Sequence, residues 1–166
     1  MNQLFQFNYF TKMSFFSFIL LASSVSAASI DLRNLGDIEI RDCGSKVEIT
    51  RIEFDQCEEF PCVVHHGETA TGRAHMVARA ATQSLTCSII GIIDGVELPF
   101  NGCPRDACEN LSTGDCAVEE GEELVYDMAI PILAAYPTIE LEGKWMLKDD
   151  SGENFFCLLI PMKIEP

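Results

Sequence analysis

The chain of 166 residues has the length of a single domain, and it carries 11 basic against 26 acidic residues, a formal charge of −15. This excess argues against nucleic acid and anionic membrane surfaces as partners, because both bind to clustered lysine and arginine side chains. Acidity of this degree is typical of a protein kept soluble by its charge.

Residues 1–27 have the pattern of a secretory signal peptide. Lys12 is their only charged residue, and an apolar run follows it. Val25 and Ala27 fit the small-residue positions of a signal peptidase site, with the next residue as an alternative end. The apolar run is too short to span a bilayer, so a membrane anchor is the less favoured interpretation. The mature chain, residues 28–166, would carry a formal charge of −16 and be secreted.

Alternating apolar and polar residues, the period of a half-buried strand, recur along the mature chain. Near its start Val47 and Ile49 alternate, and the phase then slips to Ile52 and Phe54, which indicates a bulge or bend. Four further apolar faces follow in chain order. They are Ala74, Met76, Ala78 and Ala80; Leu124, Tyr126, Met128 and Ile130; Ile139, Leu141, Gly143, Trp145 and Leu147; and Phe156, Leu158, Ile160, Met162 and Ile164.

Turn signals separate these faces. They are His66-Gly67, Asp94-Gly95, Asn101-Gly102 and Asp150-Ser151-Gly152. Several strands at such spacing predict an all-β fold, a β-sandwich of two antiparallel sheets. Some inward positions are small, among them Ala74, Ala78 and Gly143. They can leave a cavity between the sheets, but larger residues opposite can also fill the space, and on this feature alone ordinary packing is the favoured interpretation.

All eight cysteines lie in the mature chain. An even number of cysteines behind a signal peptide predicts disulfides formed in an oxidising compartment. Zinc binding is the weaker alternative, because no paired histidine ligands follow the two C-x4-C spacings at 57–62 and 103–108. We therefore expect no bound metal.

The stretch AIPILAAYP, residues 129–137, is apolar but contains Pro131 and Pro137. Prolines interrupt sheet ladders, which argues against a strand buried on both faces. The alternative is that this corner faces an apolar guest rather than the protein's own core. Tyr136 suits the rim of such a pocket, because its ring is apolar while its hydroxyl can remain in water.

Six short motifs occur in a distinctive order along the mature chain. They are DCGS at 42–45, CEEFPC at 57–62, GIIDGVELPF at 91–100, DAC at 106–108, IPILAAYPTIELEGKW at 130–145 and FFCLLIPMKI at 155–164. In this order, and with these cysteines, the set resembles the ML lipid-recognition domain family, in the branch that transfers sterols. The resemblance implies an immunoglobulin-like β-sandwich that opens between its sheets to hold one lipid.

The resemblance also implies three disulfides. Two are Cys43–Cys157 and Cys57–Cys62. The third ends at Cys116, and its partner is either Cys108, which fits the DAC motif and is favoured, or Cys103, which is nearer to the preceding motif. Cys87 and Cys103 then fall outside the family's six cysteines, and they either pair with each other or leave one as a small buried apolar group.

By the same resemblance, Phe100, Ile132 and Tyr136 line the mouth of the lipid pocket. Leu98, Pro131 and Trp145 complete the expected lipid-binding set. The alternative is that Phe100, Ile132 and Tyr136 are ordinary core residues. Without the resemblance, the sequence would favour this alternative.

An exposed apolar turn meets membranes or a membrane receptor in the sterol-transfer relatives. Here Ile92 and Ile93 keep its apolar character, but Asp94 and Glu97 add charge to it. These charges argue against direct transfer to a bilayer and leave pocket binding unaffected. Separately, Asn110 begins the sequon Asn-Leu-Ser and is a candidate glycosylation site.

The resemblance therefore implies a secreted, non-enzymatic carrier that binds and transports a sterol or another apolar lipid. We expect a monomer without a cofactor, in the extracellular space or the lysosomal lumen. A second interpretation is a recognition protein for microbial lipids in innate immunity, or a carrier of fatty acids or semiochemicals. An enzyme is least favoured, because the three histidines belong to no recognisable motif with a nucleophile.

Overall fold

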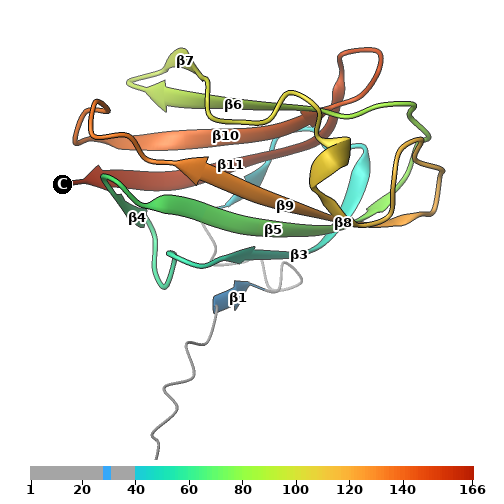
Figure 1. Ribbon diagram of the computed structural model, residues 1–166, viewed down its shortest axis with the longest axis horizontal. Helices are drawn as coiled ribbons and strands as arrows, with labels where there is room; N and C mark the ends of the chain where they lie inside the picture. Colours follow the sequence, from blue (N-terminus) through green and yellow to red (C-terminus); the bar gives the residue numbers. More distant parts are fainter. Residues whose placement is uncertain (1–27, 31–39) are drawn as a thin grey trace, which may run out of the picture.

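Two β-sheets pack face to face and make up nearly all of the protein (Figure 1). The computed structural model describes the backbone of residues 28–30 and all of residues 40–166. The expected signal peptide, residues 1–27, lies outside the described residues. Apart from the short 3-10 helix η2 (Cys108–Asn110), every element of the described chain is a strand. The predicted all-β sandwich is confirmed.

The first sheet has five strands in the order β1-β3-β5-β9-β8, and all neighbours in it are antiparallel. Its strands are β1 (Ala28–Ile30), β3 (Val47–Phe54), β5 (Thr69–Ala78), β9 (Glu123–Pro131) and β8 (Leu111–Thr113). β5 and β9 form its centre, and they run side by side across the lower layer in Figure 1.

The second sheet has the order β2-β11-β10-β6-β7, with β4 also paired to β11. Its strands are β2 (Arg41–Asp42), β11 (Asn154–Glu165), β10 (Glu140–Lys148), β6 (Thr86–Ile93), β7 (Val96–Phe100) and β4 (Cys62–His65). The pairing of β4 with β11 is parallel, and it is the exception to the predicted antiparallel pattern in the described part of the chain.

The inward faces of both sheets form a single apolar core. On the first sheet the expected faces around Met76 and Leu124 are buried, and on the second those around Trp145 and Leu158 are buried. In β5 and β9 these side chains alternate with exposed or half-exposed ones, as a sheet with one solvated face requires. In β10 and β11 the runs 145–147 and 155–158 are buried without alternating. Alternation therefore identifies the core face of β5 and β9 correctly.

The predicted phase slip in β3 is confirmed as a bulge. Ile49 pairs with Met76 and Arg51 with His75, so Thr50 is an extra residue between consecutive pairs. The extra residue restores the inward direction for Ile52, which is fully buried.

The Asp94-Gly95 signal joins β6 and β7 in a two-residue hairpin. Both residues have positive φ, 50° and 80°, as a type I′ turn needs to match the twist of the flanking strands. At the other end of β5, the expected face extends too far. The strand ends at Ala78, and Ala80 lies in a bend. At this end the Arg79 amide donates to the carbonyl of Lys46 (3.1 Å).

Four disulfides join all eight cysteines. The pairs are Cys43–Cys157, Cys57–Cys62, Cys87–Cys103 and Cys108–Cys116. The third disulfide of the family set thus ends at Cys108, and the two additional cysteines pair with each other.

Candidate ligand-binding pocket

A cavity of about 80 Å³ lies between the two sheets. Among the residues that the structure describes, none that lines it is charged, and Gln56 and Thr71 are the only lining residues with amide or hydroxyl side chains. Both polar groups are already engaged. The Gln56 amide donates to the carbonyl of Thr69 (3.1 Å) and accepts from the Thr71 amide (3.0 Å). The free surface of the cavity is therefore almost wholly apolar.

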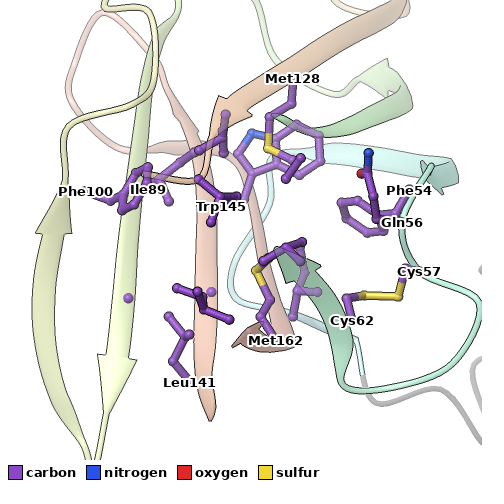
Figure 2. A pocket seen from close by; sticks show the side chains of 18 of the residues that line it. Phe54, Gln56, Cys57, Cys62, Ile89, Phe100, Met128, Leu141, Trp145 and Met162 are labelled. Atoms are coloured by element: carbon purple, nitrogen blue, oxygen red, sulfur yellow. A yellow bond between two sulfur atoms is a disulfide. The ribbon is translucent and has the colours of Figure 1, made fainter. Parts of the chain in front are cut away.

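Both sheets contribute to the wall. Phe54, Met128 and Ile130 come from the first sheet, and Ile89 and Ile160 come from the second. Figure 2 shows Phe100 and Ile89 on one side of the pocket and Phe54 with the Cys57–Cys62 disulfide on the other. The cavity therefore runs between the sheets and does not lie in a surface loop.

One end of the pocket is closed by aromatic packing. The Trp145 ring lies 4.8 Å from Phe156, 5.9 Å from Tyr126 and 6.1 Å from Phe54, measured between ring centroids. The rings are tilted or edge-on, arrangements that are favourable for aromatic pairs. Trp145 is thereby fixed from three sides, and this end of the pocket is rigid.

Two polar atoms are buried in this aromatic cluster. Neither Tyr126 Oη nor Trp145 Nε1 has a hydrogen-bond partner among residues 40–166. Burial raises the pKa of Tyr126 to about 12, because the phenolate would lose its hydration. The hydroxyl therefore stays neutral at any physiological pH.

The opposite end of the pocket, which we call the outer end, carries exposed apolar side chains. Val96 is 59 % exposed, and Leu98 and Leu133 are each 49 % exposed. This end includes the β6–β7 turn and the C terminus, on the left in Figure 1. Apolar groups that gather at the end of an apolar cavity mark the side from which a ligand would enter.

The segment that follows β9 closes over the outer end and is held there by hydrogen bonds. The Ile132 amide donates to the carbonyl of Glu68 (2.8 Å), and the Ile132 carbonyl accepts from the Gly67 amide (2.7 Å). His66 Nε2 donates to the carbonyl of Tyr136 (3.0 Å). The β4–β5 turn therefore holds this segment in place through these hydrogen bonds.

The residues expected to bind lipid fall into three groups. Phe100, Ile132 and Trp145 line the cavity. Tyr136 does not line it, but its ring lies 4.9 Å from that of Phe100 and packs against the wall from outside. Leu98 and Pro131 lie at the outer end with exposed side chains and are not part of the lining.

Sequence reasoning missed several lining residues. Phe54 and Met128 belong to predicted inward faces, and the same alternation that placed them in the core could have placed them in the pocket. Gln56 lies just beyond β3, in a segment without a periodic pattern, and no sequence signal identifies it.

The two isoleucines of the expected contact turn point to opposite faces. Ile93 pairs with Val96 on the inward face, whereas Ile92 pairs with Glu97 on one side and Glu142 on the other. Both carboxylates also form ion pairs, Glu97 with Lys144 (3.0 Å) and Glu142 with Arg41. A charged strip therefore surrounds Ile92.

The other candidate residues lie away from the pocket. Asn110 ends η2 beside the edge strand β8 and is half-buried. His65 lies near Glu68 (3.4 Å), and His75 lies on the outer face of the first sheet, 3.6 Å from Glu53. Within the described ranges, no helix is long and apolar enough to cross a membrane.

Comparisons with known proteins agree with this architecture. Residues 37–164 match the family model of the ML domain. The chain is 30 % identical over 148 residues to the NPC intracellular cholesterol transporter 2 of Canis lupus familiaris, covering 89 % of this chain and 98 % of the relative. It is 29 % identical over 133 residues to homolog a of that transporter in Drosophila melanogaster, covering 78 % and 89 %.

A solved structure shares the fold. A Niemann-Pick type C2 protein from the Japanese carpenter ant superposes with a TM-score of 0.71 at 20 % identity, covering 77 % of this chain and all of that one. The family match spans most of the chain and includes the cavity and every strand of the two sheets except β1. This chain therefore belongs to the ML domain family.

Proposed function

We propose that this protein is a non-enzymatic carrier that binds a sterol between its two sheets and transports it through an aqueous compartment. The observation that carries the proposal is the almost wholly apolar cavity at the centre of an ML domain. The names of the mammalian and insect relatives support cholesterol or a similar sterol as the ligand.

Apolar burial supplies enough free energy for this function. A sterol that buries roughly 400 Å² of apolar surface gains about 10 kcal/mol at about 25 cal/mol/Å². Lost motional freedom and side-chain ordering remove several kcal/mol of this gain. Micromolar or tighter binding remains, with no cofactor and no charged contact.

The cavity has to expand to accept such a ligand. Its volume of about 80 Å³ is below the range of about 300–1,000 Å³ that is usual for ligand pockets. Met128, Leu141 and Met162 line it, and methionine adapts its shape readily. We infer that these three flexible side chains change their rotamers as the ligand enters from the outer end.

The positions of the histidines support the absence of catalysis. None of the three lines the cavity, and His66 is bonded to a backbone carbonyl. The described lining therefore offers no histidine that could act as a general base toward a bound ligand.

The sharpest test enlarges one lining residue. Ile132 is 4 % exposed and lines the cavity, so Ile132→Phe should fill ligand space and weaken sterol binding about tenfold, or about 1.4 kcal/mol. The melting temperature of the delipidated protein should stay near that of the wild type. Titration with a fluorescent sterol, alongside thermal unfolding, measures both.

Two matched variants control this experiment. Leu133→Phe makes a comparable enlargement one residue later at an exposed position and should change neither quantity. Ile52→Phe overpacks a fully buried position outside the pocket and should cost about 1–3 kcal/mol of stability. If Ile132→Phe behaved like Ile52→Phe and kept wild-type sterol affinity, Ile132 would be core and the pocket assignment would be lost.

Partner contact is proposed for the outer end. Ile93, Val96 and Leu98 share the inward face there, and they offer an apolar surface continuous with the cavity. Ile92 is less suited to a bilayer, because Glu97 and Glu142 flank it. A membrane receptor that offers apolar and basic groups fits this end better. Sterol transfer to anionic vesicles without any receptor, at the rate seen with one, would contradict this choice.

We further propose that the protein is secreted or lysosomal, glycosylated at Asn110, and monomeric. A glycan at Asn110 would stand beside the edge strand β8, where it would hinder strand pairing with another chain. Loss of a glycan-sized mass in Asn110→Gln, and a monomer mass by light scattering, would support these assignments. A dimer, or unchanged mass in the variant, would reject them.

A further inference from the structure

We propose that a pair of glycines, Gly91 and Gly143, makes the pocket floor selective for flat, rigid, fused-ring lipids over single acyl chains. The inference rests on the proposed function as a lipid carrier and names the feature that sets its specificity. Both glycines line the pocket, and they pair directly with each other across β6 and β10.

The paired glycines leave bare backbone in the middle of the floor. Directly paired residues in an antiparallel sheet have Cα atoms about 4.5–5.5 Å apart, so the bare area is two strands wide. Ile160 on β11 borders it on one side, and Leu98 on β7 borders it on the other. The row above consists of Trp145 paired with Ile89, so the floor ends against the rigid aromatic cluster.

Backbone conformation does not explain these glycines. Neither is among the residues with positive φ, so alanine could adopt the same conformation. Glycine within a strand costs stability, roughly 0.5–1 kcal/mol relative to alanine. Two glycines facing each other in a central pair of strands therefore need another reason.

Close backbone packing does not explain them either. A Cβ at Gly143 would meet Met162 Sδ at 2.8 Å, and a Cβ at Gly91 would meet Leu141 Cδ1 at 3.0 Å. Both are the ends of flexible side chains. The glycines therefore keep space that Met162 and Leu141 occupy only while the pocket is empty of ligand.

The arrangement of the pocket assigns these two side chains a role as movable plugs. Figure 2 shows Leu141 and Met162 at one end of the pocket and Trp145 with Met128 at the other. Leu141 and Met162 are half-buried, whereas Trp145 is fully packed. When the plugs turn aside, the cavity extends over the glycine floor from the outer end to Trp145.

A flat ligand gains most from such a floor. A fused-ring system can lie with one face against the peptide planes of two strands, with dispersion contacts over its whole width. It cannot bend around a methyl group. An acyl chain needs a channel only one chain wide and can pass beside a methyl group by rotating about its own bonds. One added methyl group on the floor should therefore weaken the binding of fused-ring lipids much more than the binding of acyl chains.

The test compares dehydroergosterol with cis-parinaric acid, a fluorescent sterol and a fluorescent fatty acid, on the full mature protein. Gly143→Ala should weaken dehydroergosterol binding at least tenfold and change cis-parinaric acid binding less than twofold. Gly91→Ala tests the partner position independently and should behave alike. The melting temperature of each delipidated variant should equal or exceed that of the wild type, since alanine restricts the unfolded chain.

Two further variants serve as controls. Ser88→Thr adds one methyl to β6 outside the pocket lining and should leave both affinities unchanged. Gly143→Ala combined with Met162→Ala removes the side chain that the new methyl meets but keeps the methyl on the floor, and it should bind dehydroergosterol no better than Gly143→Ala alone. Recovery of wild-type affinity in the double variant would overturn the inference, because the methyl would then act only by displacing Met162.

The outcomes separate this inference from the proposed function. If the wild type binds neither probe, the carrier function fails. If the wild type binds dehydroergosterol and both alanine variants bind it equally well, the carrier function stands and the glycine floor is overturned. An equal loss of both probes would also overturn it, because the glycines would then provide volume without selectivity.

Discussion

Asp149 holds the turn between β10 and β11 together. Its carboxylate accepts hydrogen bonds from Lys46 Nζ (2.8 Å), the Ser151 hydroxyl (2.6 Å) and the Glu153 amide (2.9 Å). Burial alone would raise the pKa of Asp149, but the hydrogen bonds from these groups outweigh it and lower the pKa from 3.8 to about 2. The ionised carboxylate therefore stabilises the folded chain relative to the unfolded chain.

The sign of this shift gives a pH dependence. Stability from Asp149 is fully present above its unfolded pKa near 4 and is lost as pH falls through about 2. Asp149→Asn keeps one acceptor but removes the charge, and it should cost about 1.5–3 kcal/mol at pH 7. Urea unfolding at pH 7, 4 and 2 should show the difference from the wild type shrinking toward zero at pH 2. A difference that stays constant would mean that the charge is irrelevant.

At the scale of single residues, motif order indicated part of the cavity lining but not every side chain of it, and lipid binding by these residues stays a prediction. Phe100 and Ile132 line the cavity as the resemblance implied, whereas Tyr136 packs behind Phe100. Gln56 could not be foreseen, because its place in the wall depends on hydrogen bonds to a neighbouring strand.

At the scale of elements, the loop after β7 braces the pocket wall. Gly102 lies so close to Phe100 and Ile130 that a Cβ there would meet their side chains at 2.5 and 3.2 Å. The next residue, Cys103, is tied to Cys87 on β6. This disulfide, which is additional to the family's three, therefore holds the loop against two lining residues.

Removing this disulfide should affect stability and binding together. Cys87→Ala with Cys103→Ala opens a loop of 16 residues, which costs about 3 kcal/mol in the chain-entropy model, and it should weaken sterol binding because Phe100 loses its support. The control is Cys108→Ala with Cys116→Ala, which opens a loop of 8 residues away from the pocket. It should lower the melting temperature but keep sterol affinity. Equal losses of sterol affinity in the two double variants would show that the Cys87–Cys103 disulfide gives the pocket wall no specific support.

Strands with one buried and one solvated face could be predicted from their alternation. β5 and β9 show it along their whole length, and the bulge in β3 appears as a break in it. β10 and β11 show it only in part, because residues 145–147 and 155–158 are buried without a break. β6 shows no such alternation, because Ile89, Ile90, Ile92 and Ile93 occupy both of its faces. β2, β4 and β8 have 2, 4 and 3 residues, too few for a period to appear.

At the scale of the whole molecule, the sequence predicted a sandwich but not the size of its cavity. The wall comes from strands far apart in the chain, and its volume depends on how closely the sheets approach. Small residues such as Gly143 suggested space, yet Met162 fills much of it in this structure. Local patterns carry no information about such a contact between distant side chains.

The processing of the N terminus is a prediction for the whole chain. If residues 1–27 are a signal peptide, secreted protein should begin at or next to Ala28, as N-terminal sequencing of secreted material can establish. The physical reason is that the lone Lys12 and the apolar run after it direct the chain into the secretory pathway. Retention of Met1 in secreted protein would contradict this assignment.

The long edge of β11 gives the disulfides a second role. β11 has 12 residues, and on the side away from β10 only the short strands β2 and β4 cover it. Cys43, next to β2, is bonded to Cys157, and Cys62 at the start of β4 is bonded to Cys57. An uncovered strand edge is a template on which other chains can add strands. We expect the two disulfides to protect the edge of β11 from aggregation by holding β2 and β4 in place. In a reducing environment both short strands could detach, and copies of the protein could then pair edge to edge through β11.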